Sequence, residues 1–331
     1  MKIIGSYPKT RLRRLRKSEW IRNLVTENSI THNDLILPIF ITDGRNKIET
    51  IKSMPGIKRY TIDKLPAILN QVKKYKIPMV AIFPYTPDNK KDNLGSEALN
   101  PNNLICRAIR LIRKKFNGIG IMCDVALDPY TSHGHDGIIK KDKIDNDETI
   151  KILVKQALLQ AEMGCDVIAP SDMMDGRIGR IRTVLDNNNF QDTLILSYAA
   201  KYASGFYGPF RDAIGSGSKL GKDGKLTYQM DPSNSDEALR EVAFDINEGA
   251  DMVMVKPGLP YLDIIHKIKD KFKIPVLAYQ VSGEYSLIKK GIKNKIINEE
   301  AIIESLMCFK RAGASAIVSY FSLDIAKKIK S

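Results

Sequence analysis

Two lysines of this chain each end an apolar run. Lys256 directly follows the apolar residues 252–255, and Lys201 follows the run "LILSYAA" over 194–200. A single lysine at such a position usually extends its ammonium group into solvent. If two lysines share an apolar cavity, each disfavours the charge of the other and burial adds to that effect, so one becomes a neutral nucleophile near pH 7. A neutral lysine attacks carbonyl carbons, and we therefore expect Schiff-base chemistry.

Other side chains could bind the anionic groups of a substrate. Arg211 has the planar, two-pronged donor geometry that carboxylates match. Lys225 and Gln229 follow in the same glycine-rich stretch, where Lys225 is equally compatible with a solvated loop residue. Ser282 and Tyr320 end two later apolar runs and could donate hydroxyl hydrogen bonds to a second carboxylate. The pattern favours a substrate that carries carboxylate groups.

The stretch "CDVALDPYTSHGHDG" (123–137) raises the question of a metal. Asp124, Asp128, Asp136 and two histidines crowd together in it. Hard oxygen ligands of this kind suit magnesium and not zinc. For Asp128 and Asp136, an interpretation as turn-capping aspartates is at least as good. Asp124 stands at the end of an apolar run and is the better catalytic candidate.

The elements that must position these residues are short apolar runs alternating with longer stretches of helical period. The expected strands are 35–41, 79–85, 119–127, 167–173, 194–200, 252–258, 276–282 and 316–321. The expected helices include 64–75, 104–116, 147–164 and 235–251. Eight near-continuous apolar strands with intervening helices predict an α/β fold, a closed (β/α)8 TIM barrel. No GxGxxG motif follows the first strand, so neither a dinucleotide fold nor an organic cofactor is expected.

Chemistry in such a barrel belongs at the C-terminal ends of the strands. The polar residues that fall there are Asp124, Ser171, Asp172, Lys201, Lys256, Ser282 and Tyr320. The longest stretch without a clear element is 202–234, which is either a lid over the site or disordered. Its aromatic residues Tyr207 and Phe210 favour the lid, and we expect them to line the substrate site together with Ser171.

Residues 1–34 precede the first strand and carry too few periodic apolar positions for a domain, so we interpret them as an arm that contacts a partner. Residues 35–331 then form one catalytic barrel, with the lid at about 202–234. The four cysteines form no CxxC or CxC pair, which indicates a reducing, cytoplasmic setting. No apolar run approaches the roughly 20 residues needed to span a bilayer, and no signal-peptide pattern begins at Met1.

The formal charge of +14, from 52 Lys plus Arg against 38 Asp plus Glu, leaves three classes open. They are a nucleic-acid binder, an enzyme of anionic substrates, and a protein with a solvated basic surface. The densest basic cluster, "KTRLRRLRK" (9–17), contains no aromatic residue on which bases could stack, so no nucleic-acid partner is expected.

With these residues assembled, the chain resembles the porphobilinogen synthase family, also called delta-aminolevulinic acid dehydratase. The resemblance extends from the "RLRRLR" arm to "SYF" near the end. It is carried most specifically by "APSDMMDGRIG", "SYAAKYASGFYGPFRDA", "YQMDPSNSDEA", "MVMVKPGLPYLDI" and "YQVSGEY". It implies that two molecules of 5-aminolevulinate are joined into porphobilinogen, with loss of two waters, in tetrapyrrole (heme) biosynthesis.

The resemblance also implies roles for individual residues. Lys256 matches the lysine that forms the Schiff base with the substrate that becomes the propionate side, and Lys201 matches the second lysine of the active site. The residues that match positions around the other substrate's carboxylate are Arg211, Lys225 and Gln229. Those that match positions holding the first substrate's carboxylate are Ser282 and Tyr320.

The metal pattern departs from one branch of that family. The zinc-dependent branch has three cysteines where this chain has Ala126, Asp128 and Asp136, so zinc is not expected. The chain resembles the magnesium-responsive branch, in which an allosteric magnesium lies near a glutamate that matches Glu241. The resemblance further implies a homo-octamer in which residues 1–34 embrace a neighbour.

Two alternatives stay open. A Schiff-base aldolase-type lyase on the same barrel needs only one lysine, and the pair of Lys201 and Lys256 argues against it. A binding module without turnover would use the basic charge for nucleic acid.

Overall fold

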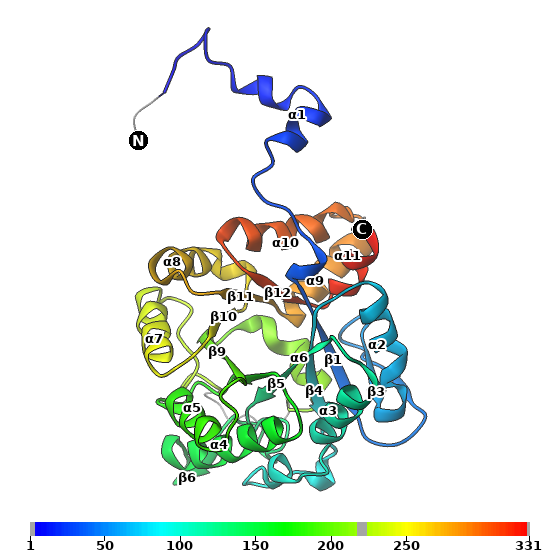
Figure 1. Ribbon diagram of the computed structural model, residues 1–331, viewed down its shortest axis with the longest axis vertical. Coiled ribbons are helices and arrows are strands. Elements are labelled where there is room, and N and C mark those ends of the chain that lie inside the picture. Colours follow the sequence, from blue (N-terminus) through cyan, green and yellow to red (C-terminus); the bar gives the residue numbers. More distant parts are fainter. Residues whose placement is uncertain (1–3, 217–223, 330–331) are drawn as a thin grey trace.

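Within the part of the chain that the structure describes, residues 4–216 and 224–329 of a computed structural model, eight parallel strands close into a barrel (Figure 1). The last strand pairs with the first, Leu35 facing Ile317 in register, so the barrel has no open edge. The barrel strands are β1 (Leu35–Thr42), β4 (Met79–Tyr85), β5 (Gly120–Val125), β8 (Val167–Pro170), β9 (Leu194–Lys201), β10 (Met252–Lys256), β11 (Val276–Gln280) and β12 (Ala316–Ser319). The expected TIM barrel and its eight strands are confirmed.

The strands form where the sequence is apolar without interruption, because both of their faces are covered. Every residue of β1, β8 and β11 is buried, so these strands show no polar alternation. Several expected runs extend beyond the strands that form. The run 252–258 stops pairing at Lys256, because Pro257 has no N–H to donate. The residues after the strand ends therefore belong to the loops that surround the barrel mouth.

Helices cover the outside of the barrel (Figure 1). They are α2 (Leu65–Lys74), α3 (Leu104–Lys115), α4 (Asn146–Glu162), α5 (Arg177–Asn187), α7 (Asp236–Asn247), α8 (Leu262–Phe272), α9 (Ser282–Lys293), α10 (Glu300–Ala312) and α11 (Ser322–Lys328). In α3, Ile105, Ile109 and Ile112 lie buried on one face while the last turn is basic. The Asn103 side chain caps this helix by accepting a hydrogen bond from the N–H of Cys106 at 2.8 Å.

Short strands and 3-10 helices lie outside the barrel, and the sequence patterns did not predict them. β3 (Lys58–Thr61) extends the sheet beside β1 and pairs with β2 (Ile48–Thr50), while β6 (Ile138–Lys140) and β7 (Lys143–Asp145) form a separate hairpin. These strands are too short and too exposed to show a clear period. Short 3-10 helices are η2 (His32–Asp34), η3 (Ile62–Lys64), η4 (Asp88–Lys90), η5 (Ser96–Leu99) and η7 (Leu259–Tyr261).

The expected lid is more regular than its sequence suggested. It begins with a 3-10 helix, η6 (Gly205–Tyr207), and continues with α6 (Gly208–Ile214). Pro209 suits the first turn of α6, and Gly215 ends the helix with a left-handed φ of 71°. The expectation that this stretch lacks regular elements was therefore wrong for residues 205–214. Residues 217–223 of the expected lid lie outside the described residues.

The N-terminal segment extends away from the barrel (Figure 1). It contains η1 (Leu12–Arg16) and α1 (Glu19–Leu24), neither of which has a buried residue. Apolar side chains on it are open to solvent, with Trp20 exposed by 63% and Leu24 by 73%. Among the described residues, no helix combines the length and the apolar character that crossing a membrane requires.

Candidate active site

Lys201 and Lys256 are direct partners across neighbouring parallel strands, at the C-terminal ends of β9 and β10. Both line one cavity at the barrel mouth, as the sequence predicted. The side chains around this cavity are those of Asp124, Asp128, Ser171, Lys201, Tyr207, Phe210, Arg211, Lys225, Gln229 and Lys256. About 20 Å³ of free space remains between them, which is room for one water molecule. A substrate can enter only if some of these side chains move.

The Lys256 side chain is 5% exposed, and no acceptor pairs with its nitrogen among the residues that the structure describes. Aromatic rings surround the nitrogen instead, the nearest being Tyr279 with its centroid 4.5 Å from Nζ. Burial, and then the positive charge of Lys201, lower the pKa of Lys256 to about 7, while Asp124 opposes the shift. A large fraction of Lys256 is therefore a neutral amine at neutral pH.

Lys201 has the opposite surroundings. Its ammonium group donates hydrogen bonds to the carbonyl oxygen of Ser171 and, at 3.4 Å, to Oδ2 of Asp136. The two lysines thus differ in their partners although they occupy equivalent strand positions.

Lys225 reaches from the described end of the lid into the same cavity. Its nitrogen donates to Oδ2 of Asp128 at 3.0 Å and to Oδ1 of Asp136 at 2.9 Å. Burial opposes the charge of Lys225, but the two carboxylates raise its pKa. Burial likewise opposes the charge of Asp136, but the positive charges of Lys201 and Lys225 lower its pKa. Asp128 shows the opposite shift, because burial and the negative charge of Asp136 raise its pKa to about 6. The interpretation of Lys225 as a solvated loop residue is wrong.

These contacts bear on the metal prediction. A cation held by Asp128 and Asp136 would have to displace the ammonium group of Lys225, because both carboxylates already bind it. In this arrangement the two residues do not fit a magnesium ion, and we derive no catalytic step through a metal there. Their role as metal ligands stays a prediction.

Asp124 and Ser171 line the same cavity as the two lysines. Asp124 is half-buried, and burial raises the pKa of its carboxyl group while Lys256 and Lys201 lower it. Its Oδ1 atom is buried and has no hydrogen-bond partner among the described residues. A carboxyl group with a free oxygen beside a nucleophilic amine suits proton transfer to and from a substrate.

Ser282 and Tyr320 do not line the cavity in this structure. The hydroxyl of Ser282 accepts a hydrogen bond from the N–H of Phe210 at 2.8 Å. The Phe210 ring packs 4.9 Å from the nitrogen of Lys256 and 5.8 Å from the ring of Phe40, on which Tyr320 also stacks. Phe210 therefore occupies the space through which a substrate on Lys256 would reach these two hydroxyls.

The remaining predicted residues line the cavity from the lid side. Tyr207 donates its hydroxyl to the carbonyl oxygen of Lys256 at 3.0 Å, which joins the lid to the end of β10. Arg211 is half-buried at the rim. The Oε1 atom of Gln229 is buried without a protein partner among the described residues.

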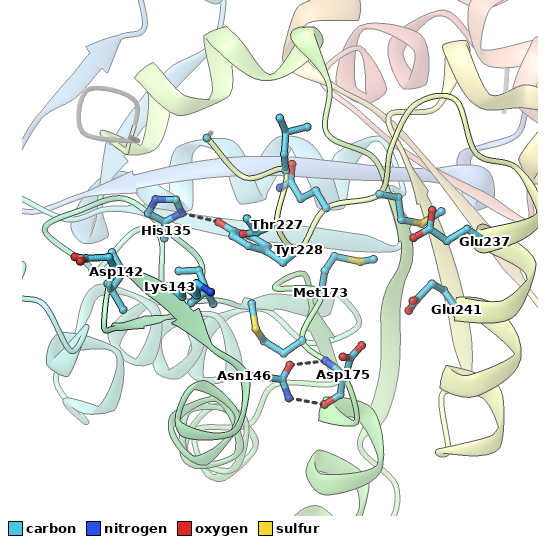
Figure 2. A pocket seen from close by; sticks show the side chains of 17 residues that line it. His135, Asp142, Lys143, Asn146, Met173, Asp175, Thr227, Tyr228, Glu237 and Glu241 are labelled. Atoms are coloured by element: carbon cyan, nitrogen blue, oxygen red, sulfur yellow. Dashed lines mark hydrogen bonds between the residues drawn. The ribbon is translucent and has the colours of Figure 1, made fainter. Parts of the chain in front are cut away.

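Gln229 also lines a second, larger cavity of about 810 Å³ (Figure 2). Figure 2 shows His135 hydrogen-bonded to Tyr228 on one side of it and Glu237 and Glu241 on another. The two glutamates are four residues apart on α7 and so share a helix face. Burial raises the pKa of Glu241, which makes an added cation favourable beside it.

In the described part of the chain, no three His, Cys, Asp or Glu side chains come together closely enough to hold a metal ion. Magnesium usually keeps several waters and needs only one or two carboxylates. The chemistry of Glu241 and its neighbours therefore fits a water-rich magnesium site, and the donors do not suit zinc, which prefers thiolates and imidazoles.

Two residues beside Lys256 escaped the sequence analysis, Tyr198 and Tyr279. Both rings lie within about 5 Å of its nitrogen. Tyr279 belongs to a run that was predicted as a strand, but aromatic residues inside barrels are usually core. Tyr198 precedes Lys201 by three positions, so the strand period assigned it to the opposite face. No signal in the sequence separated these tyrosines from packing residues.

Comparisons with known proteins agree with this geometry. A family model described as "Delta-aminolevulinic acid dehydratase" matches residues 9–328. The chain is 56% identical over 322 residues to the delta-aminolevulinic acid dehydratase of Bradyrhizobium diazoefficiens, covering 97% of this chain and 91% of that protein. It is 49% identical to the enzyme of Methanothermus sociabilis, covering 98% and 99%, and 49% identical to the chloroplastic enzyme of Oryza sativa, covering 96% and 74%.

A solved structure shows the same fold. It is delta-aminolevulinic acid dehydratase (porphobilinogen synthase) from Toxoplasma gondii in complex with the reaction product porphobilinogen. It superposes with a TM-score of 0.94 at 46% identity, covering 97% of this chain and 91% of that one.

Proposed function

The chain belongs to the delta-aminolevulinic acid dehydratase family, and we propose that it joins two molecules of 5-aminolevulinate into porphobilinogen through a Schiff base on Lys256. It is a lyase of porphyrin biosynthesis, and each turnover releases two waters. One observation carries the assignment of the nucleophile. Lys201 donates to two acceptors, whereas Lys256 is buried with no acceptor among the described residues and has its pKa lowered to about 7.

The first steps follow from this asymmetry. The neutral amine of Lys256 attacks the ketone carbon of one substrate, and loss of water leaves an iminium group. The positive nitrogen makes the neighbouring carbon acidic, and Asp124, which lines the same cavity, would accept that proton. Lys201 then holds the second substrate while the carbon–carbon and carbon–nitrogen bonds form.

Carboxylate binding explains the remaining predicted residues. Arg211, Lys225 and Gln229 line the lid side of the cavity and would hold the carboxylate of the second substrate. A carboxylate that reaches Ser282 and Tyr320 must displace Phe210 from the Ser282 hydroxyl. We therefore propose that the described lid residues open for entry and close afterwards, keeping water from the imines.

Trapping the imine tests this function. The protein is incubated with 5-aminolevulinate, reduced with borohydride and digested, and the modified lysine is located by mass spectrometry. We expect the adduct on Lys256 and porphobilinogen in the unreduced reaction. Lys256→Ala should abolish both. Absence of any adduct in the native chain, or full turnover by Lys256→Ala, would contradict the proposal.

We also propose that the chain belongs to the magnesium-responsive branch. Magnesium near Glu241 would bind in the larger cavity of about 810 Å³, away from the lysines, and its positive charge would stabilise α7. EDTA should slow turnover and added magnesium should restore it. Glu241→Gln should lose the response to magnesium while retaining basal turnover, and restoration by zinc alone would contradict this assignment.

The N-terminal arm supports a proposal about assembly. Its exposed apolar residues, such as Leu12 and Trp20, have no partner within the described part of this chain. We propose that residues 1–34 embrace a neighbouring copy in a homo-octamer. Removal of these residues should reduce the mass measured by light scattering, and an unchanged mass would exclude the role.

We further propose a cytoplasmic location. The cysteines are free, and three of the four are buried, as expected in a reducing compartment. Cell fractionation tests this, and recovery of the protein only in an organelle would contradict it.

A further inference from the structure

Three tyrosine rings surround the nitrogen of Lys256, and two of them have occupied hydroxyls. Tyr207 donates to the carbonyl oxygen of Lys256 at 3.0 Å, and the Tyr279 hydroxyl pairs with that of Tyr320 at 3.1 Å. The third hydroxyl, that of Tyr198, is buried and pairs with no protein group in residues 4–216 and 224–329. The ring centroid of Tyr198 lies 5.0 Å from the nitrogen of Lys256.

An unpaired hydroxyl in this place destabilises the fold. Leaving a buried donor without a partner is destabilising, and most buried polar groups in native proteins are hydrogen-bonded. Phenylalanine would fill the same space without this cost. The Tyr198 hydroxyl is therefore free to form a hydrogen bond with a bound substrate.

An irregularity in the sheet brings Tyr198 to this side of the strand. Ser197 pairs with Val253 and Ala200 with Val255, so three steps along β9 match two steps along β10. The extra residue is a β-bulge, which reverses the alternation of side chains. Tyr198 and Lys201, three positions apart, would face opposite sides of a regular strand. Because of the bulge, both face the interior of the barrel mouth.

The protonation state of Tyr198 decides what it can do. Burial, and then the charge of Asp124, raise the pKa of its hydroxyl well above the usual value. The phenol therefore keeps its proton at neutral pH and serves as a donor. Burial raises the pKa of Asp124, and its buried Oδ1 has no hydrogen-bond partner among the described residues, so its acid form is more accessible than that of an ordinary aspartate.

We propose that the Tyr198 hydroxyl is the acid that protonates the departing oxygen when the substrate adduct on Lys256 loses water. This assignment rests on the proposed function, because it concerns the imine on Lys256. It goes beyond that function by giving the dehydration step its own proton donor.

The step balances with the groups at hand. Attack by Lys256 forms the nitrogen–carbon bond, and a proton moves from nitrogen to oxygen to give a carbinolamine. The carbon–oxygen bond then breaks, the oxygen leaves as water with the proton of Tyr198, and the nitrogen lone pair forms the iminium double bond. Asp124 returns a proton to the phenolate. The resulting carboxylate faces the iminium and accepts the proton of the adjacent carbon.

Tyr198→Phe in the full chain tests the role, because it removes only the unpaired oxygen. The probe is levulinate, which keeps the ketone and carboxylate of the substrate but lacks the amine. We expect the rate of borohydride-trapped adduct formation at Lys256 to fall about a hundredfold or more, while the melting temperature stays equal or rises. Tyr285→Phe is the matched control, because the Tyr285 hydroxyl is also buried but donates to Pro55 at 2.6 Å, away from the lysines. It should lower the melting temperature and leave the adduct rate unchanged.

A second variant keeps the test decisive if Tyr198→Phe fails to fold. Site-specific 3-fluorotyrosine at position 198 preserves the shape and makes the phenol more acidic, so adduct formation should become faster. A structural role predicts no change in rate. Adduct formation by Tyr198→Phe at the native rate would overturn the assignment to Tyr198 alone. Failure of the native chain to form any adduct at Lys256 would overturn the proposed function itself.

Discussion

Lys201 and Lys256 are Cα partners across β9 and β10, but of the two only Lys201 forms an ion pair with a carboxylate of the described residues. Asp136 lies 3.4 Å from Lys201, whereas aromatic rings surround Lys256. The charge of Lys201 disfavours protonation of Lys256. The pairing thus makes Lys256 the better nucleophile of the two.

The first prediction concerns pH. Since the pKa of Lys256 is lowered to about 7, its reactive neutral form increases as pH rises through 7 and reaches a plateau above about 8. An amine with the ordinary pKa of 10.5 would be neutral in roughly one molecule of 3000 at pH 7. The rate of levulinate adduct formation at Lys256 should follow this curve. A rate that still rises steeply between pH 8 and 10 would contradict the shifted pKa.

The second prediction separates the effect of Lys201 from that of burial. Lys201→Met removes the neighbouring charge, so the midpoint of the same pH curve should move upward and adduct formation at pH 7 should slow. Lys201→Arg keeps the charge and should leave the midpoint in place. If both variants retain the native midpoint, burial alone sets the pKa of Lys256.

The third prediction concerns the shared carboxylate. Asp136 binds both Lys201 and Lys225, whereas Asp128 binds Lys225 only. A hydrogen bond to a charged group contributes about 1.5–3 kcal/mol, so Asp136→Asn should lower kcat/KM by roughly tenfold or more. Asp128→Asn should have the smaller effect, because Lys225 keeps Asp136. Steady-state kinetics at saturating magnesium provide the comparison, and the reverse order would refute this division of roles.

Much of this site was predictable because its residues end continuous apolar strands. Lys201, Lys256, Asp124 and Ser171 were found in that way, since parallel strands of a barrel present their ends to one cavity. Tyr198 was not, because a bulge breaks the period on which strand predictions rest.

Residues of the lid were harder to place from sequence. Lys225 was equally compatible with a solvated loop residue. Its carboxylate partner Asp136 lies 89 residues earlier in the chain, so their contact depends on how the loop folds back. Ser282 and Tyr320 were predicted at strand ends, but Ser282 begins α9, Tyr320 follows the last residue of β12, and the Ser282 hydroxyl is bonded to the lid residue Phe210. Long-range loop contacts of this kind leave no local period in the sequence.

The fourth prediction tests the packing of the lid. A Cβ atom on Gly283 would lie 2.4 Å from the carbonyl oxygen of Phe206, against backbone that cannot easily yield. Gly283→Ala should therefore push η6 away from α9, raise KM and lower stability by about 1–3 kcal/mol. Gly205→Ala is the control, because an added Cβ there meets nothing within 4 Å. Equal KM values for the two variants would show that this contact does not position the lid.

The fifth prediction concerns a buried ion pair behind the site. Arg177 is 2% exposed and donates to Asp245 at 2.9 Å, and Asp245 also accepts from Ser197 at 2.5 Å. This pair joins α5 and α7 to β9, the strand that carries Tyr198 and Lys201. Asp172 also pairs with Arg177, at 3.8 Å, so removing Asp245 leaves the buried charge only partly compensated and should cost up to about 3–5 kcal/mol.

Asp245→Ala should therefore lower the free energy of unfolding by about that amount in urea titrations. Asp270→Ala removes a carboxylate from an exposed pair with Lys273, and it should leave the unfolding curve unchanged. Asp245→Asn distinguishes charge from packing, because it keeps the shape and can still accept from Ser197. If Asp245→Asn is as stable as the native chain, the charge of Asp245 does not stabilise Arg177, and the link between α7 and β9 depends on packing alone.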